Sequence, residues 1–514
     1  MSSVVVGAGA VSIEDVVAVA RHNATITLDS GALAGVAASR AVIDGLASDP
    51  NPHYGISTGF GALATTFIES DRRAQLQASL VRSHAAGSGP EVEREVIRAL
   101  MLLRLSTLMT GRTGVRPVVA ETYAAVINAG ITPVVREYGS LGCSGDLAPL
   151  SHCALATLGE GDVRNAEGVL MPAAEALASA GITPLKLEEK EGLALINGTD
   201  GMLGMLALAI TDLKMLMTTV DISAAMSIEG LMGTDKVFSA DLHALRPQVG
   251  QGQSATNLRN ILADSPIVHS HSGPEDGRVQ DAYSLRCSPQ VHGGARDTIA
   301  HAEMVAGREL ASAVDNPVLT EDGRVESNGN FHGAPVAYVL DFLAIVAADV
   351  ASMSERRTDR FLDRARNQGL PPFLAHEVGV DSGLMIAQYT AAGLVSEMKR
   401  LAVPASADSI PSSAMQEDHV SMGWHAGRKL RKAVDAFSRV VAIELMTAAR
   451  GIDLREPLKP SPVTGAVIAE LRSNGVAGPG ADRFLSPEIE AAAELTLSGR
   501  IAAVAQSAST APLI

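Results

Sequence analysis

Aromatic side chains are scarce in this sequence of 514 residues, which has one tryptophan, six tyrosines and nine phenylalanines. Hydrophobic residues nevertheless make up 46% of the chain, so alanine, valine, leucine, isoleucine and methionine must fill the core. Small or singly branched side chains of this kind suit closely packed helices. The composition therefore favours a large helical core.

Cysteine and positive charge are also in short supply. The chain has three cysteines, Cys143, Cys153 and Cys287. They form no C-x-x-C pair, and so sparse a set supports neither a disulfide framework nor a zinc site. The formal net charge is −16, and an acidic surface repels phosphate backbones and anionic membranes. We expect no nucleic-acid or membrane partner.

Targeting, membrane and metal signals are weak as well. The first arginine is Arg21, so no basic leader opens the chain, and charged residues such as Asp212 and Asp341 interrupt the longest apolar stretches. A membrane-spanning helix needs about 20 largely apolar residues. His269 and His271 lie in a stretch, 264–278, that is typical of an exposed loop, without further ligands nearby. We expect a reduced, cytoplasmic protein that holds no metal.

Helical periodicity strengthens beyond residue 200. Apolar residues recur at helical spacing through 425–450, where Gly451 offers a C-terminal stop, and 200–232 and 335–365 predict two more long helices. Between residues 50 and 200, short helical segments alternate with turns. We therefore expect a mainly α fold, in which an elongated bundle of long helices over 201–514 follows a smaller mixed N-terminal region over 1–200.

The N-terminus predicts a strand at 4–6 and a helix capped by Ser12. Gly7 and Gly9 between them resemble the start of a dinucleotide-binding fingerprint. The third small residue is missing and no regular alternation of strands and helices follows, so we favour an ordinary turn.

The most informative segment, 139–152, reads Gly-Ser-Leu-Gly-Cys-Ser-Gly-Asp-Leu-Ala-Pro-Leu-Ser-His. One interpretation makes Ser144 an acyl-transfer nucleophile with His152 as its base. A nucleophile elbow has the pattern G-x-S-x-G, whereas Gly145 follows Ser144 directly. Triads are recognised by geometry, so the structure must decide. The plainest interpretation is a glycine-rich turn before a helix that starts near Asp146.

Backbone cyclisation is a further interpretation of the same segment. In a tightly bent loop, the nitrogen of Gly145 can attack the carbonyl carbon of Cys143. Loss of one water closes a five-membered ring, and loss of a second from Ser144 leaves an exocyclic methylidene, which is an electrophile. Composition alone does not select this chemistry.

The segment resembles the prosthetic-group motif of the aromatic amino acid ammonia-lyases, in which a fused Ala-Ser-Gly forms methylidene-imidazolone. Further blocks resemble that family in the same order: 54–61, 191–199, 280–287, 328–333 and 415–419. The resemblance implies a 4-methylidene-imidazol-5-one cofactor made from Cys143, Ser144 and Gly145, with no metal or nucleotide. Cys143 stands where the commoner pattern has alanine, but the ring uses only its backbone carbonyl.

Two features resemble the histidine-specific members of that family. The pair Ser83-His84 occupies the place of Phe-Leu in phenylalanine enzymes and His-Leu in tyrosine enzymes, and Glu417 is also of the histidine type. A carboxylate and an imidazole can each satisfy one ring nitrogen of histidine, whereas a phenyl ring would leave both groups unpaired. The implied reaction is elimination of ammonia from L-histidine to give trans-urocanate, the first step of histidine degradation.

The resemblance also suggests roles for single residues. Tyr54 is the leading candidate for the base, with Tyr283 assisting; a tyrosine serves as a base near neutrality only where its surroundings favour the ionised form. Arg286 suits the substrate carboxylate because its planar fork binds two oxygens. Asn197 suits the amino group or the ring carbonyl of the cofactor. The supporting pocket residues are Gln280 and Phe331.

Other points stay open at this level. Asp146 either accepts a proton during cyclisation or caps the following helix, and Asp200, which replaces a glutamine of many members, receives no role. The resemblance implies a homotetramer whose active sites combine more than one subunit. The alternatives are a lyase or aminomutase acting on tyrosine or phenylalanine, and a catalytically silent helical assembly protein.

Overall fold

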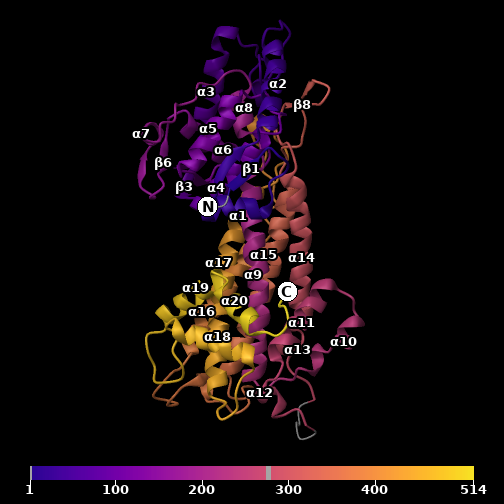
Figure 1. Cartoon of the computed structure of the whole chain (residues 1–514), viewed down its shortest axis with the longest axis vertical. Coiled ribbons are helices and arrows are strands. Elements are labelled where there is room, and N and C mark those ends of the chain that lie inside the picture. Colours follow the sequence, from indigo (N-terminus) through magenta and orange to yellow (C-terminus); the bar gives the residue numbers. More distant parts are fainter. Residues whose placement is uncertain (1–2, 274–278) are drawn as a thin grey trace. The chain divides into compact units, whose positions relative to one another are not determined.

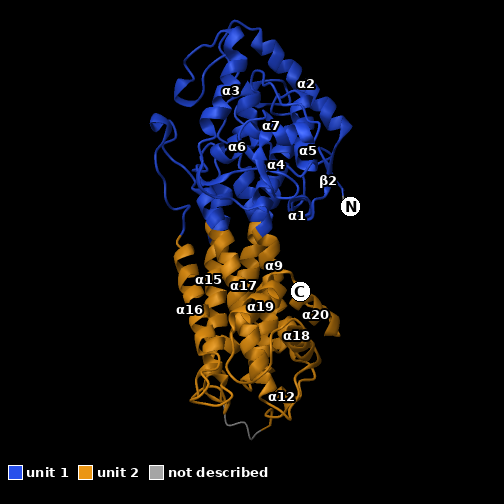
Figure 2. Ribbon diagram, turned by 90° about the vertical axis from the view of Figure 1, so that its left-hand side faces the viewer, with its two compact units in different colours: residues 1–208, 303–341, 404–428 blue, residues 209–302, 342–403, 429–514 orange. Residues whose placement is uncertain are grey.

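The chain is mainly helical, as the sequence predicts (Figure 1). The computed structural model describes residues 3–273 and 279–514. They form two compact units, coloured separately in Figure 2. Unit 1 comprises Met1–Leu208, Glu303–Asp341 and Pro404–Arg428, and unit 2 comprises Ala209–Ala302, Phe342–Val403 and Lys429–Ile514.

Unit 1 combines helices with small sheets. Its helices are α1 (Ile13–His22), α2 (Ser30–Ala47), α3 (Arg73–His84), α4 (Arg94–Leu108), α5 (Pro117–Asn128), α6 (Leu147–Thr157), α7 (Ala173–Ser179) and α8 (Glu191–Ile196). Its strands are β1 (Ser3–Val6), β2 (Thr25–Leu28), β3 (Ser88–Glu91), β4 (Thr132–Pro133), β5 (Arg136–Tyr138), β6 (Asp162–Arg164), β7 (Leu170–Pro172), β8 (Val318–Leu319) and β9 (Val325–Glu326). Three short 3-10 turns, η1 (Gly61–Leu63), η2 (Ser70–Arg72) and η5 (Ser413–Met415), complete it.

The N-terminal predictions of a strand and a capped helix are confirmed. Strand β1 pairs in parallel with β2, and the Ser12 side chain accepts a hydrogen bond from the Asp15 N–H while the Asp15 carboxylate accepts one from the Ser12 N–H. This reciprocal capping box fixes the start of α1. Among the described residues, β1 and β2 form a sheet of two strands, far from the broad parallel sheet of a dinucleotide-binding fold.

Four long helices each contain residues of both units. They are α9 (Asp200–Gly230), α14 (Ser288–Leu310), α15 (Ala334–Leu362) and α17 (Gly423–Asp453). The remaining helices belong to unit 2: α10 (Ala240–Ala244), α11 (Val249–Leu262), α12 (Pro266–His269), α13 (Tyr283–Arg286), α16 (Met385–Leu401), α18 (Pro462–Ser473), α19 (Ser486–Leu497) and α20 (Arg500–Ala508), with the 3-10 turns η3 (Lys236–Phe238) and η4 (Pro372–Leu374). The predicted long helices at 200–232, 335–365 and 425–450 are confirmed.

The predicted helix stop at Gly451 is wrong, because α17 continues to Asp453. A Cβ on Gly451 would lie 2.4 Å from Cε1 of Phe361, a buried ring on α15. This glycine therefore serves close packing between two helices and not termination. The contact joins segments far apart in the chain, so no local pattern could reveal it.

The expected exposed loop at 264–278 is wrong in its first part. Helix α12 forms there because the Ser265 side chain accepts a hydrogen bond from the Val268 N–H and Pro266 occupies the first turn, both favourable at a helix start. Ile267 and Val268 are buried. The end of the predicted loop, 274–278, lies outside the described residues.

A single carboxylate joins three of the long helices within unit 2. The fully buried Glu444 of α17 pairs with Arg357 of α15. It also accepts hydrogen bonds from the hydroxyls of Ser223 and Ser227 on α9 and of Ser354 on α15, at 2.6 to 2.9 Å. Buried charge is tolerated only when it is paired and hydrogen-bonded in this way.

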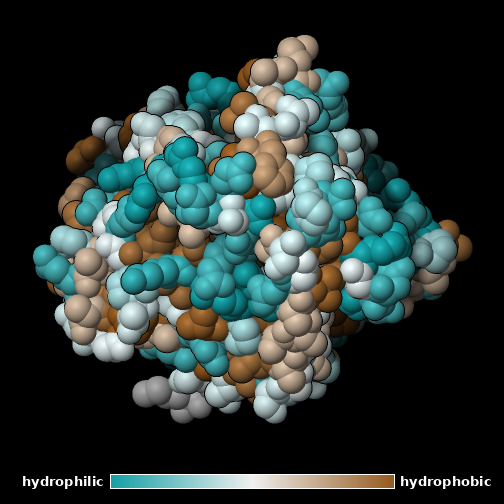
Figure 3. Space-filling view, turned by 90° about the horizontal axis from the view of Figure 1, so that it is seen from above, coloured by the Kyte–Doolittle hydropathy of each residue, from teal (hydrophilic) through white to brown (hydrophobic). Residues whose placement is uncertain are grey.

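Two helical stretches are long and apolar enough to cross a membrane, which differs from the sequence prediction. In Glu191–Gly230, the apolar window is 100% buried inside the protein, and in Ala334–Leu362 it is 61% buried. Core helices of globular proteins pass the same test. The surface seen from above mixes hydrophilic with hydrophobic side chains (Figure 3).

Candidate active site

The cofactor-motif loop of unit 1, residues 139–146, connects β5 to α6 and is held by other segments of the chain. The Gly142 carbonyl accepts hydrogen bonds from the Ser421 hydroxyl at 2.6 Å and the Gly333 N–H at 3.1 Å. The Leu141 carbonyl accepts one from the Met422 N–H at 2.8 Å. The loop is thereby fixed by two segments that follow it by about 200 and 280 residues.

Asp146 anchors the C-terminal end of the loop. One carboxylate oxygen accepts a hydrogen bond from the Ser140 hydroxyl at 2.8 Å, and the other accepts from the N–H groups of Gly201 and Met202, both at 2.9 Å. These two donors belong to the first turn of α9, where N–H groups lack partners within the helix. Asp146 thus caps α9 and not the helix that follows it, whose cap has no side-chain hydrogen bond. Its complete burial raises the pKa of this carboxyl to about 7.

Gly145 is bent into a conformation that only glycine adopts easily. Its φ is +79°, and a Cβ there would lie 2.1 Å from the carbonyl oxygen of Gly198. That carbonyl also accepts a hydrogen bond from the Asp146 N–H at 2.7 Å. The Gly198 peptide thus packs directly against the turn, as the tightly bent loop of the cyclisation hypothesis requires.

Glu417 contacts the loop through both of its carboxylate oxygens. Its Oε1 accepts a hydrogen bond from the Ser144 hydroxyl at 2.9 Å, and its Oε2 accepts one from the Cys143 thiol at 2.9 Å. Burial, together with the Glu417 carboxylate, raises the pKa of the Cys143 thiol to about 12. The thiol therefore keeps its proton near neutrality and acts as a donor.

A short turn presents Glu417 to the loop. Ser412 and Glu417 pair as an isolated antiparallel bridge, and the Ser412 hydroxyl donates to Glu417 Oε2 at 3.0 Å. Between them, Ser413, Ala414 and Met415 all have φ near +50 to +70°, a conformation that costs L-residues about 1 kcal/mol or more each. The turn is thus a strained segment that fixes one carboxylate.

A pocket of about 940 Å³ opens over the cofactor-motif loop. The sequence-predicted residues that line it are Tyr54, Ser83, His84, Cys143, Ser144, Asn197, Phe331 and Glu417. All of them belong to unit 1, and Gly145 is buried in the same loop. The structure therefore brings together residues that lie up to 363 positions apart, from Tyr54 to Glu417.

Hydrogen bonding defines the protonation of His84. Its Nδ1 lies 2.9 Å from the Leu80 carbonyl oxygen, which can only accept, so Nδ1 carries the hydrogen. Burial lowers the pKa of His84, against the opposing effects of the Leu80 hydrogen bond and the charge of Glu417. The neutral ring leaves Nε2 as an acceptor.

Two further pocket residues have polar atoms suited to a ligand. The buried Oδ1 of Asn197 has no hydrogen-bond partner among the described residues, and leaving such an acceptor unmatched costs about 1–3 kcal/mol. The phenolic oxygen of Tyr54 accepts a hydrogen bond from the Gly61 N–H at 3.2 Å.

Three predicted site residues are not among the described residues that line this pocket. Gln280, Tyr283 and Arg286 belong to unit 2. Tyr283 is 70% exposed, and the Arg286 guanidinium lies 4.8 Å from the centre of its ring.

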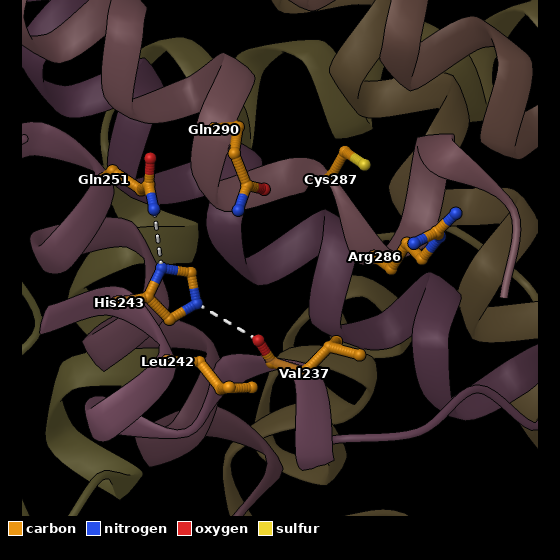
Figure 4. A pocket seen from close by; sticks show the side chains of 7 residues that line it. All are labelled: Val237, Leu242, His243, Gln251, Arg286, Cys287 and Gln290. Atoms are coloured by element: carbon orange, nitrogen blue, oxygen red, sulfur yellow. Dashed lines mark hydrogen bonds between the residues drawn. The ribbon is translucent and has the colours of Figure 1, made fainter. Parts of the chain in front are cut away.

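Arg286 also lines a separate cavity of about 200 Å³ in unit 2, together with Val237, Leu242, His243, Gln251, Cys287 and Gln290 (Figure 4). In it, the His243 Nε2 donates to the Val237 carbonyl and its Nδ1 accepts from Gln251. The buried Nε of Arg286 and Oε1 of Gln290 have no hydrogen-bond partner in the described part of the chain.

The serine-nucleophile interpretation does not fit this geometry. The Ser144 hydroxyl donates to a carboxylate, and the Nε2 of His152 accepts a hydrogen bond from the Gly87 N–H at 3.1 Å. Neither group has the other as its hydrogen-bond partner, as nucleophile and base require. Within residues 3–273 and 279–514, the His, Cys, Asp and Glu side chains form no cluster that could ligate a metal.

Sequence reasoning missed some groups that shape the site. His332 and His419 line the pocket with their rings stacked at a centroid distance of 5.8 Å. Both lie inside the quoted blocks 328–333 and 415–419, so the signal was present. Ser412 and Ser421 gave no signal, because a serine that anchors a distant segment looks like any other in the sequence.

The chain is similar to known proteins along its whole length. The family described as aromatic amino acid lyase matches residues 11–473. The histidine ammonia-lyase of Streptomyces griseus is 64% identical over 515 residues, with 100% of both chains covered. Two solved structures are also similar. A tyrosine aminomutase from Streptomyces globisporus has a TM-score of 0.94 at 35% identity, covering 100% of both chains. A histidine ammonia-lyase from Trypanosoma cruzi has a TM-score of 0.90 at 37% identity, covering 98% of this chain and 95% of the other.

Proposed function

Because the chain belongs to the aromatic amino acid lyase family, we propose that it is a histidine ammonia-lyase, a carbon–nitrogen lyase that converts L-histidine to trans-urocanate and ammonia. This reaction is the first step of histidine degradation. The observation that carries the substrate assignment is that His84 and Glu417 line the same pocket as Ser144. Each offers an acceptor for an imidazole N–H, and a ring protonated on both nitrogens would satisfy both acceptors.

The backbone alone does not select the substrate. A tyrosine aminomutase and a histidine ammonia-lyase superpose on this chain about equally well. Discrimination must therefore come from the side chains of the pocket. A phenyl ring would leave the acceptors of His84 and Glu417 unpaired, and a phenol could pair with only one of them. Sites built around polar partners reject an analogue that lacks the polar group strongly. The 64% identity to a histidine ammonia-lyase supports the same assignment.

Cys143, Ser144 and Gly145 would form the methylidene-imidazolone cofactor. The residues fit this group, because Gly145 has a positive φ and packs against the Gly198 peptide, which bends the loop where the ring has to close. The cofactor would supply an electrophile that helps ammonia to leave, which no ordinary side chain can provide. No metal or nucleotide is needed for this chemistry.

The other pocket residues bind the substrate and move its proton. The Oδ1 of Asn197, which has no partner in the described part of the chain, would accept a hydrogen bond from the substrate amino group. The ionised Oη of Tyr54 would take the proton from the substrate β-carbon and become neutral, and the Gly61 N–H donates a hydrogen bond to the same oxygen. Phe331 would pack against the apolar part of the substrate, and Ser83 would support the His84 ring, whose Nδ1 lies 3.0 Å from its hydroxyl.

We further propose a cytoplasmic homotetramer in which Gln280, Tyr283 and Arg286 reach the pocket from another subunit. Arg286 would bind the substrate carboxylate and Tyr283 would assist proton transfer. The high exposure of Tyr283 in the single chain supports this arrangement. So do pairs of exposed apolar residues at helical spacing: Phe342 and Ile345 on α15, and Ile386 and Tyr389 on α16. Three free cysteines agree with a reducing compartment.

The activity is tested by mixing the purified protein with L-histidine and following the ultraviolet absorbance of the conjugated acrylate product. L-phenylalanine and L-tyrosine are run in parallel. We expect a rise with histidine alone, and none with the Ser144→Ala variant, which cannot form the methylidene. A rise with another aromatic amino acid and none with histidine would overturn the substrate assignment.

The shared site is tested by mixing two inactive variants. Ser144→Ala removes the cofactor-forming serine of the pocket in unit 1. Arg286→Ala removes the proposed carboxylate-binding arginine of unit 2. Hetero-oligomers made by coexpression regain part of the activity if one site draws on two subunits, because some sites then combine two intact halves. Coexpressed variants that stay as inactive as each variant alone would contradict a shared site.

A further inference from the structure

Glu417 uses its two carboxylate oxygens differently. Oε2 accepts hydrogen bonds from the Cys143 thiol at 2.9 Å and the Ser412 hydroxyl at 3.0 Å. Oε1 accepts one from the Ser144 hydroxyl, at 2.9 Å. In the uncyclised chain, the carboxylate is thus held at both ends.

Cyclisation removes one of these donors and spares the other two. Ring closure joins the Gly145 nitrogen to the Cys143 carbonyl carbon, and the carbonyl oxygen leaves as water with the N–H hydrogens of Ser144 and Gly145. Ser144 then loses its α-hydrogen and its hydroxyl as a second water. The Ser144 donor to Oε1 disappears, whereas the Cys143 thiol and the Ser412 hydroxyl take no part and remain on Oε2.

Resting on the proposed function, we propose that Cys143 and Ser412 are positioning residues that hold Glu417 by Oε2, so that the Oε1 released by cyclisation accepts the imidazole N–H of L-histidine. Cofactor formation and opening of the ring-binding acceptor are then a single event. The uncyclised chain has this acceptor occupied by its own serine.

The surroundings of Glu417 support a specific anchor. The carboxylate follows a turn with three consecutive residues in the left-handed region, Ser413, Ala414 and Met415. Such a turn persists only where its surroundings hold it. Ser412 and Cys143 both do so by donating hydrogen bonds to Glu417. The Cys143 thiol is buried beside Val420 and Met422, so its direction is set by packing as well as by the hydrogen bond.

The role of Cys143 is distinct from cofactor chemistry, because the ring uses only its backbone. Alanine, the commoner residue of the family pattern at this position, would cyclise but could not donate to Oε2. Serine would cyclise and keep a donor. The two substitutions therefore separate the thiol's hydrogen bond from the formation of the ring.

The test compares Cys143→Ala, Cys143→Ser and Ser412→Ala with the wild-type enzyme, and Cys153→Ala, a buried thiol of α6, is the matched control. Intact mass reports the loss of two waters, and steady-state kinetics with L-histidine report KM and kcat. Loss of an anchoring hydrogen bond should raise KM roughly three- to tenfold in Cys143→Ala and Ser412→Ala. The mass loss stays complete, Cys143→Ser stays within about twofold of the wild type, and Cys153→Ala leaves KM unchanged.

Binding without turnover gives a second measurement. Calorimetry of L-histidine with Ser144→Ala, which lacks both the hydroxyl and the cofactor, should show a Kd that rises roughly three- to tenfold when Cys143→Ala is added. An unchanged KM and Kd in the anchor variants would overturn the inference, as would a Cys143→Ala protein that fails to cyclise. A wild-type protein that does not convert histidine would instead overturn the proposed function.

Discussion

Gly145 and Gly198 lie backbone against backbone, so that a Cβ on Gly145 would come within 2.1 Å of the carbonyl oxygen of Gly198. The contact forces the loop between β5 and α6 into the bend at which a ring can close. It also means that Gly145 has two separate reasons to be glycine, since its φ is +79° and its side-chain space is filled.

Gly145→Ala should therefore prevent cyclisation and destabilise the protein by about 2–4 kcal/mol, from overpacking together with a strained φ. Intact mass should show no loss of water, and the midpoint of thermal unfolding should fall. Gly307→Ala on α14 is the control, because a Cβ there meets nothing within 4 Å, and its unfolding midpoint should not fall. An alanine variant that cyclises normally would show that the contact relaxes.

Asp146→Asn tests the effect of burial on a carboxyl. The folded-state pKa is raised to about 7, whereas the unfolded value is about 3.9. Between these values the unfolded chain releases the proton and the folded chain keeps it, so this group makes the wild type less stable as pH rises from about 4 to 7. Unfolding midpoints measured across this range should decline in the wild type relative to Asp146→Asn. Parallel curves for the two proteins would contradict the raised pKa.

The ion pair between Lys190 and Asp315 is buried on both sides, with side chains 1% and 0% exposed. Asp315→Ala would strand a buried ammonium group and should destabilise the protein by about 3–5 kcal/mol. The matched control is Glu397→Ala, which breaks an exposed pair with Arg400 and should change stability by less than about 1 kcal/mol. Denaturant unfolding of both variants checks the difference, and equal effects would argue that Lys190 finds another partner.

Replacing Ser83 by Phe and His84 by Leu tests the origin of specificity. The double variant removes the ring acceptor of His84 and fills its place with apolar atoms, so kcat/KM for L-histidine should fall by roughly 100-fold or more. Activity towards L-phenylalanine should rise from its starting level, and parallel kinetics with both substrates measure the change. A variant that keeps its preference for histidine would assign the discrimination to Glu417 alone.

Local periodicity was sufficient to predict the long helices. Helices α9 and α15 begin and end within about three residues of the predicted ranges, and each contains a long apolar stretch. The features that sequence reasoning missed depend on distant segments. The ring of Phe361 decides the role of Gly451, and the start of α9 decides what Asp146 caps.

The site was predicted from resemblance and not from periodicity. Nothing in the spacing of Tyr54, Asn197 and Glu417 indicates that they line one pocket, since they are brought together only by folding. Gln280 and Arg286 show a further limit. In the proposed homotetramer they act in the site of another subunit, and neither the sequence nor a single subunit can place such residues. Their roles stay predictions.

The hydrogen bonds that Glu444 accepts from α9 and α15 set a condition on the order in which the protein can fold. The donors precede Glu444 by 87 to 221 residues, from Arg357 to Ser223, so these hydrogen bonds form only after long segments of chain have been closed, which is entropically slow. On the ribosome, Ser223, Ser227, Ser354 and Arg357 are synthesised well before the carboxylate they require. A nascent chain therefore carries α9 and α15 for some time without the residue that joins them, and in this interval it needs protection from aggregation.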